Sequence, residues 1–126
     1  MRIHATCLDH VVLNVSDLDA SRRWWSTVTG ARATRNHEGE VSFVVGGQAI
    51  RLRQGVPAPP GSISVCLLAD ASISDLYERV EELHAMHGDV HPRTAATAPV
   101  QALTIEDPDG YQVELGTYTP EAAATT

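Results

Sequence analysis

The chain has 126 residues, 43% of them hydrophobic, which predicts a single globular domain with its own core. Its formal net charge of −7 argues against a nucleic-acid partner or an anionic membrane surface, because both attract basic proteins. We expect a cytoplasmic protein with reduced thiols: the first residues lack a signal-peptide pattern, no apolar run could span a membrane, and only two cysteines are present.

The first half of the chain, about residues 7–54, predicts a strand, a helix and three further strands. Apolar residues alternate over 10–15, which is typical of a half-buried strand. Asp17 suits the N-cap of the helix that follows, and Gly30 suits its C′ position. The later strands are expected at about 31–36, 40–45 and 48–54.

The segment GVPAPPG at 55–61 predicts a semi-rigid linker, because its prolines and glycines disfavour regular structure. The second half, about 62–118, again opens with a strand and a helix, which Ser72 is expected to cap. Its last two strands are expected at 100–106 and 111–118, joined by the turn DPDG. Segment 91–99 is expected to be a loop or an irregular strand, and residues 119–126 a frayed tail.

The two halves repeat one pattern. HVVLNVSD at 10–17 corresponds to SISVCLLAD at 62–70, and GGQAIRLR at 46–53 corresponds to DGYQVELG at 109–116. In this match Arg51 takes the position of Glu114. A repeat of this length implies two copies of one supersecondary unit. The sequence therefore predicts an α+β fold made of two βαβββ modules.

With these pieces in place, the chain resembles the vicinal oxygen chelate superfamily, also called the glyoxalase/bleomycin resistance/dioxygenase proteins. The resemblance covers residues 8–118, and DPDG followed by a strand with a glutamate is its most specific part. The second half is also similar to small glyoxalase-domain proteins described as dioxygenase-related or virulence-related. The resemblance implies that the two modules form a curved, half-open barrel around a cavity.

Metal-dependent members of this superfamily place ligands at four equivalent strand positions. The resemblance puts these positions at His10, Arg51, Ser62 and Glu114. His10 and Glu114 could ligate Fe, Mn, Ni or Zn. Serine is a poor ligand, and arginine cannot ligate because it stays protonated. Arg53 faces the same side of the strand as Arg51, and two arginines favour an anionic or carbonyl-rich ligand without a metal.

Further polar residues are expected to face the cavity and to contact the ligand: Asn14, Ser62, Ser64 and Gln112. Alternatively, these side chains pair with one another or lie in an oligomer interface, and Arg51 and Glu114 form a purely structural ion pair. His10 has the alternative role of a hydrogen-bonded core residue. His84, His87 and His91 suggest a second metal site, but a solvated helix end explains them better, since no complete ligand set accompanies them.

Three functions follow as hypotheses. The first is metal-free binding of a small molecule, as in bleomycin-resistance-like proteins that sequester a drug and so confer antibiotic resistance. The second is a metal-dependent lyase, isomerase or extradiol-type dioxygenase that uses His10 and Glu114. The third is a metal-free biosynthetic enzyme in which Glu114 or His10 is the base and Arg51 stabilises negative charge. The short linker and the resemblance also predict a C2 homodimer.

Overall fold

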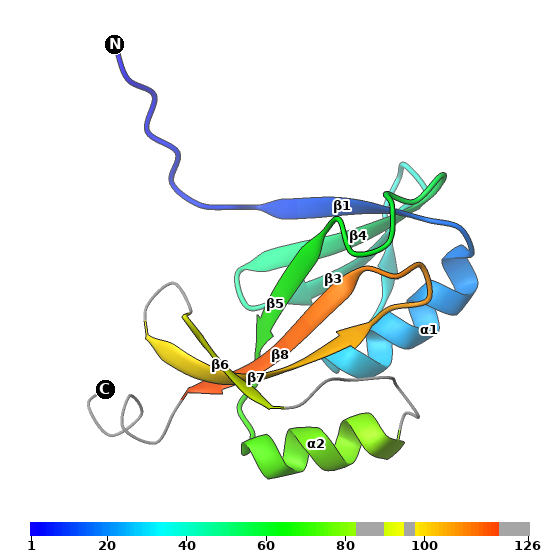
Figure 1. Cartoon of the computed structure of the whole chain (residues 1–126). Helices are drawn as coiled ribbons and strands as arrows, with labels where there is room; N and C mark the ends of the chain where they lie inside the picture. Colours follow the sequence, from blue (N-terminus) through cyan, green and yellow to red (C-terminus); the bar gives the residue numbers. More distant parts are fainter. Residues whose placement is uncertain (83–89, 95–97, 119–126) are drawn as a thin grey trace. The chain divides into compact units, whose positions relative to one another are not determined.

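The computed structural model describes residues 1–82, 90–94 and 98–118 (Figure 1). The chain divides into two compact units, Met1–Ala58 and Pro59–Thr126, and each is described here by itself. The division falls inside the predicted linker 55–61. Each unit holds one βαβββ module, so the predicted α+β fold class and the internal repeat are confirmed.

Module one is a four-stranded mixed sheet with one helix. Its elements are β1 (His10–Val15), α1 (Leu18–Thr29), β2 (Thr34–Arg35), β3 (Val41–Val45) and β4 (Gln48–Gln54). The strand order is β1-β4-β3-β2, in which β1 runs parallel to β4 and the other pairs are antiparallel. The predicted strand 31–36 is therefore shorter than expected, since only two of its residues pair with β3.

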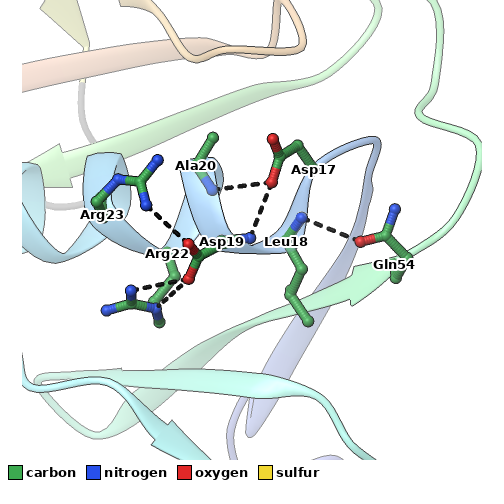
Figure 2. Close-up of polar contacts among 7 residues, drawn as sticks. All are labelled: Asp17, Leu18, Asp19, Ala20, Arg22, Arg23 and Gln54. Carbon is green, nitrogen blue, oxygen red and sulfur yellow. Dashed lines mark hydrogen bonds and ion pairs between the residues drawn. The ribbon is translucent and has the colours of Figure 1, made fainter.

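The first helix begins where the sequence predicts. The Asp17 side chain accepts hydrogen bonds from the backbone N–H groups of Asp19 and Ala20, which would otherwise lack partners at the helix start (Figure 2). The helix ends at Gly30, whose φ of 68° is the left-handed conformation that glycine adopts without strain. Both predicted caps are thus confirmed.

The side chain of Gln54 connects the end of β4 to the corner between β1 and α1. Its Oε1 accepts a hydrogen bond from the backbone N–H of Leu18 at 3.0 Å (Figure 2). Its Nε2 donates to the carbonyl oxygen of Ser16. These bonds hold β1 and β4 in register at the end of the sheet that also carries Asn14 and Arg53.

The core of module one lies on one face of its sheet. Trp25 of α1 is fully buried, and the alternating apolar residues of three strands are buried with it: Leu13, Val15, Val41, Phe43, Ile50 and Leu52. Because successive strand residues point to opposite faces, the residues between these in sequence lie on the other face of the sheet. That second face carries the polar residues considered below.

Module two repeats the arrangement with β5 (Ser64–Leu68), α2 (Ile73–Glu82), β6 (His91–Thr94), β7 (Pro99–Glu106) and β8 (Gln112–Tyr118). The strand order is β5-β8-β7-β6, with β5 parallel to β8 (Figure 1). The predicted N-cap of α2 is confirmed, because the Ser72 hydroxyl oxygen accepts from the backbone N–H of Asp75. Segment 91–94 forms a regular strand paired with β7.

The turn DPDG joins β7 to β8 and is closed by a hydrogen bond from the Gly110 N–H to the Asp107 carbonyl oxygen. The Asp107 carboxylate accepts from the backbone N–H groups of Asp109 and Tyr111, both at 2.9 Å. Asp107 and Tyr111 are both buried. A buried carboxylate that satisfies two backbone donors fixes the turn and, through it, the start of β8.

Some predictions concern residues outside those that the structure describes. His84, His87 and the predicted tail 119–126 are among them. Among the described residues, no helix is both long enough and apolar enough to cross a membrane.

Candidate functional site

The polar face of module one brings four of the predicted site residues onto two neighbouring strands. His10 and Asn14 come from β1, and Arg51 and Arg53 come from β4. In the parallel register, Val12 lies opposite Arg51 and Asn14 lies opposite Arg53, so all of them share one face. This is the face opposite the apolar core. The predicted grouping of these residues is therefore present within a single module.

A chain of polar contacts runs from Asp9 through His10 to Arg51. The Asp9 Oδ2 atom lies 2.8 Å from Nδ1 of His10, and Nε2 of His10 lies 3.4 Å from Nη1 of Arg51. The hydrogen bond with His10 is the main cause that lowers the pKa of Asp9. Because a guanidinium can only donate, this geometry favours a His10 that carries its proton on Nδ1 and accepts at Nε2.

Arg53 is held in a similar way by a neutral acceptor. Its Nε donates to the side-chain oxygen of Asn14 at 3.0 Å, and Arg53 as a whole is exposed. Arg51 is half-buried, and its Nε is buried without a hydrogen-bond partner among the described residues. An unpaired donor of this kind costs free energy unless a ligand or a solvent molecule supplies an acceptor.

Sequence reasoning missed two residues of module one that belong to this group. Asp9 precedes the predicted strand and was not considered, although an acidic residue directly before a strand histidine is a usable signal. Ser42 of β3 lies opposite Arg51 in the antiparallel register and is half-buried on the same face. Nothing in the sequence distinguishes Ser42 from other serines, because its position depends on strand pairing.

In module two the key residue is Glu114 of β8, whose side chain is 10% exposed. The ion pair that the structure gives it is with Arg93 of β6, where Nε lies 3.2 Å from Oε2. Sequence reasoning did not single out Arg93, because segment 91–99 was not predicted to be a regular strand. The predicted pair of Arg51 with Glu114 would join the two modules and stays a prediction.

Cys66 of β5 lies directly opposite Glu114 in the parallel register. Burial raises the pKa of the Cys66 thiol, and the negative charge of Glu114 adds to this effect, while Arg93 opposes it. The thiol is therefore kept protonated at neutral pH and is a poor nucleophile or metal ligand there.

The prediction that Ser62 lies in the first strand of module two is wrong. The strand begins at Ser64, and Ser62 lies in the preceding turn, where its hydroxyl donates to the carbonyl oxygen of Pro59 at 2.6 Å. The prolines of the linker favour this turn. In module one His10 pairs with Ala49, and in module two Ser64 pairs with Gln112. Because Ala49 and Gln112 each lie two residues before the matched positions Arg51 and Glu114, Ser64 is the counterpart of His10. Gln112 is half-buried at the start of β8, and Ser64 is exposed.

The donor set does not fit a divalent metal ion of the kind that the resemblance implies. The Nε2 atom of His10, which a metal would need, faces the guanidinium of Arg51, and the carboxylate of Glu114 is paired with Arg93. The remaining equivalent strand positions hold Arg51 and Ser64. Within the described ranges 1–82, 90–94 and 98–118, no three His, Cys, Asp or Glu residues gather as a metal site. His91, half-buried on β6, joins no such group.

Comparison with known proteins places this arrangement in context. The family model described as Glyoxalase/Bleomycin resistance protein/Dioxygenase superfamily matches residues 7–115. The chain is similar to virulence protein STM3117 of Salmonella typhimurium, with 29% identity over an alignment that covers 88% of this chain and 83% of that protein. It is also similar to the glyoxalase domain-containing protein RDO1 of Mycosarcoma maydis, with 27% identity and coverage of 88% and 68%.

Among solved structures, an integron cassette protein from V. cholerae superposes with a TM-score of 0.82 and 28% identity. The match covers 94% of this chain and 100% of that one. These values mean that the two chains share the whole fold.

Proposed function

Because the chain belongs to the glyoxalase/bleomycin resistance/dioxygenase superfamily, we propose that it binds an anionic or carbonyl-rich small molecule without a metal ion. In this proposal the protein sequesters its ligand and does not transform it. The polar face of module one supplies the anion-binding groups, since it carries Arg51 and Arg53 beside His10 and Asn14. Superfamily membership alone does not choose this function, because different sites occur on one fold.

The observation that carries the proposal is the position of the Arg51 guanidinium. It lies 3.4 Å from Nε2 of His10, the atom that would ligate a metal in a metal-dependent member. A guanidinium is a permanent cation that cannot ligate, and it repels a divalent ion brought to the same place. It can instead bind a carboxylate or a polarised carbonyl group of a ligand. A protein-borne cation thus takes the role that a metal has in other members.

Metal analysis combined with a ligand screen tests this function. Tag-free protein would be incubated with Fe, Mn, Ni or Zn salts, desalted and analysed by plasma mass spectrometry, beside a Glu114→Gln variant. We expect no stoichiometric metal in either protein, and we expect small anions to raise the melting temperature equally with and without a chelator. A stoichiometric metal that is lost in Glu114→Gln, or anion binding that a chelator abolishes, would overturn the proposal and restore the metal-dependent lyase, isomerase or dioxygenase.

A second candidate is metal-free acid–base catalysis, which the contact of Asp9 with Nδ1 of His10 favours. A carboxylate that holds the Nδ1 proton leaves Nε2 as a base, and Arg51 beside it could stabilise negative charge that develops on a substrate. Glu114 is less suited to this role, because its charge is balanced by Arg93. Turnover of a bound compound that survives chelation and is lost in His10→Gln would favour this enzyme over a sequestering protein.

The remaining parts of the proposal concern assembly and location. We propose a homodimer, as the resemblance implies, and a cytoplasmic location, which the two free cysteines favour. Light scattering at micromolar concentration would give twice the mass of the chain for a dimer, and a monomeric mass would contradict it. A role in antibiotic resistance would appear as growth of expressing cells in the presence of a drug that the purified protein binds.

A further inference from the structure

The two arginines on β4 differ from three other arginines of the described residues in what holds them. Arg22 and Arg23 form ion pairs with Asp19 at 2.9 and 2.7 Å (Figure 2), and Arg93 pairs with Glu114. Each of these arginines thus contacts a carboxylate, and Arg22 and Arg23 share that of Asp19.

Arg51 and Arg53 are instead held by neutral acceptors. Arg51 donates to an imidazole nitrogen of His10, and Arg53 donates to an amide oxygen of Asn14. These contacts orient the guanidinium groups without neutralising them. The carboxylate of Asp9 contacts His10 and reaches Arg51 through its charge, without a direct ion pair. In a chain with a net charge of −7, two oriented arginines on one strand that form no ion pair among the described residues require an explanation.

The spacing of the two arginines sets the geometry of what they can bind. Residues 51 and 53 are two apart on a strand, and each residue advances about 3.3 Å, so their Cα atoms are about 7 Å apart on the same face. Each guanidinium can hold one carboxylate through two nitrogens. Arg53 is exposed, whereas Nε of Arg51 is buried and has no partner among the described residues.

From these observations we infer that the ligand carries two anionic groups, separated by a short chain or a ring, and that Arg51 and Arg53 each bind one of them. This assignment rests on the proposed function and narrows it from an anionic ligand to a dianionic one of the dicarboxylate class. The two anionic groups act as linked ligands, so that binding of the first raises the effective concentration of the second.

The test uses simple acids as probes, measured by calorimetry or ligand-observed NMR at fixed pH and low salt. Malonate, succinate, glutarate and adipate vary the separation of the carboxylates, and butyrate supplies one carboxylate alone. We expect the best dicarboxylate to bind roughly tenfold to a hundredfold more tightly than butyrate, with a clear optimum of length. Affinity that is the same for all of these acids would overturn the inference.

Three variants separate specific contacts from general electrostatics. Arg53→Gln should reduce the affinity for the best dicarboxylate to about that of butyrate, because only one arginine remains to bind a carboxylate. Arg23→Gln removes the same charge from α1 and should leave every affinity unchanged. Arg51→Gln should weaken both kinds of acid, and circular dichroism would confirm that it folds.

Failure of the inference can be told apart from failure of the proposed function. If butyrate and the dicarboxylates bind alike, and Arg53→Gln binds as the wild type does, the protein binds anions but not through two arginines. If none of the acids binds the wild type and added metal restores binding, the metal-free function itself is wrong. If Arg23→Gln weakens binding as much as Arg53→Gln does, only general charge attraction is present and the inference is overturned.

Discussion

Gly110 in the DPDG turn offers a prediction whose magnitude follows from the structure. Its φ is 86°, a conformation that costs an L-residue about 1–2 kcal/mol. A Cβ atom built at this position would also lie 2.7 Å from Cβ and 3.2 Å from Cα of Pro60. Relief of this overlap requires the backbone of the linker to move, and overpacking of this kind costs about 1–3 kcal/mol. Gly110→Ala should therefore destabilise the protein by about 2–5 kcal/mol.

Gly61 is a matched control in the same module. Its φ of 78° is close to that of Gly110, but the nearest atom to a Cβ there is Nε2 of Gln112 at an ordinary 3.9 Å. Gly61→Ala should thus cost only the conformational part, about 1–2 kcal/mol. The free energy of unfolding of the three proteins would be measured by urea titration followed by circular dichroism. Equal costs for the two variants, within about 0.5 kcal/mol, would refute the reasoning that the linker packs against this turn.

Three further predictions concern single side chains. Asp17→Ala removes the N-cap of α1 and should lower the free energy of unfolding by about 1 kcal/mol, whereas Asp17→Asn should cost much less, as urea titration would show. In a Cys7→Ser background, the thiol of Cys66 should react more readily with a thiol reagent in Glu114→Gln and less readily in Arg93→Gln. The reason is that Glu114 raises the pKa of Cys66 and Arg93 lowers it. A change of reactivity in the same direction in both variants would contradict this. Arg22 and Arg23 lower the pKa of Asp19 in the folded protein. The Asp19 carboxylate therefore stabilises the fold above the pKa that it has in the unfolded chain, and this stabilisation is lost as the pH falls through its pKa in the folded protein. Asp19→Asn should accordingly lose less stability in acid than the wild type, as urea titrations at several pH values would show.

The chemical difference between the two modules is the main result for function. Arg51 of β4 and Glu114 of β8 hold equivalent positions in the repeat, opposite Val12 and Cys66 respectively. Each module therefore presents its own kind of polar face: a cationic one on β1 and β4, and on β8 an anionic side chain that pairs with Arg93.

Much of the candidate site could be predicted from the pattern of the strands alone. The alternation over 10–15 placed His10 and Asn14 on one face, and the two-residue spacing placed Arg51 and Arg53 together. Arg93 and Asp9 could not be recognised in this way. Arg93 reaches Glu114 across the sheet from a strand with little apolar alternation, and Asp9 lies outside any periodic segment.

The sequence by itself determined the two modules, both helix caps in module one and the DPDG turn, because each depends on residues close together in the chain. Only the tertiary structure decided which polar groups meet: that Arg51 faces His10, that Glu114 pairs with Arg93, and that Ser64 rather than Ser62 is the counterpart of His10. These contacts depend on the register between strands distant in sequence. A shift of one residue in that register moves every side chain to the other face, and no local pattern records which register packing selects.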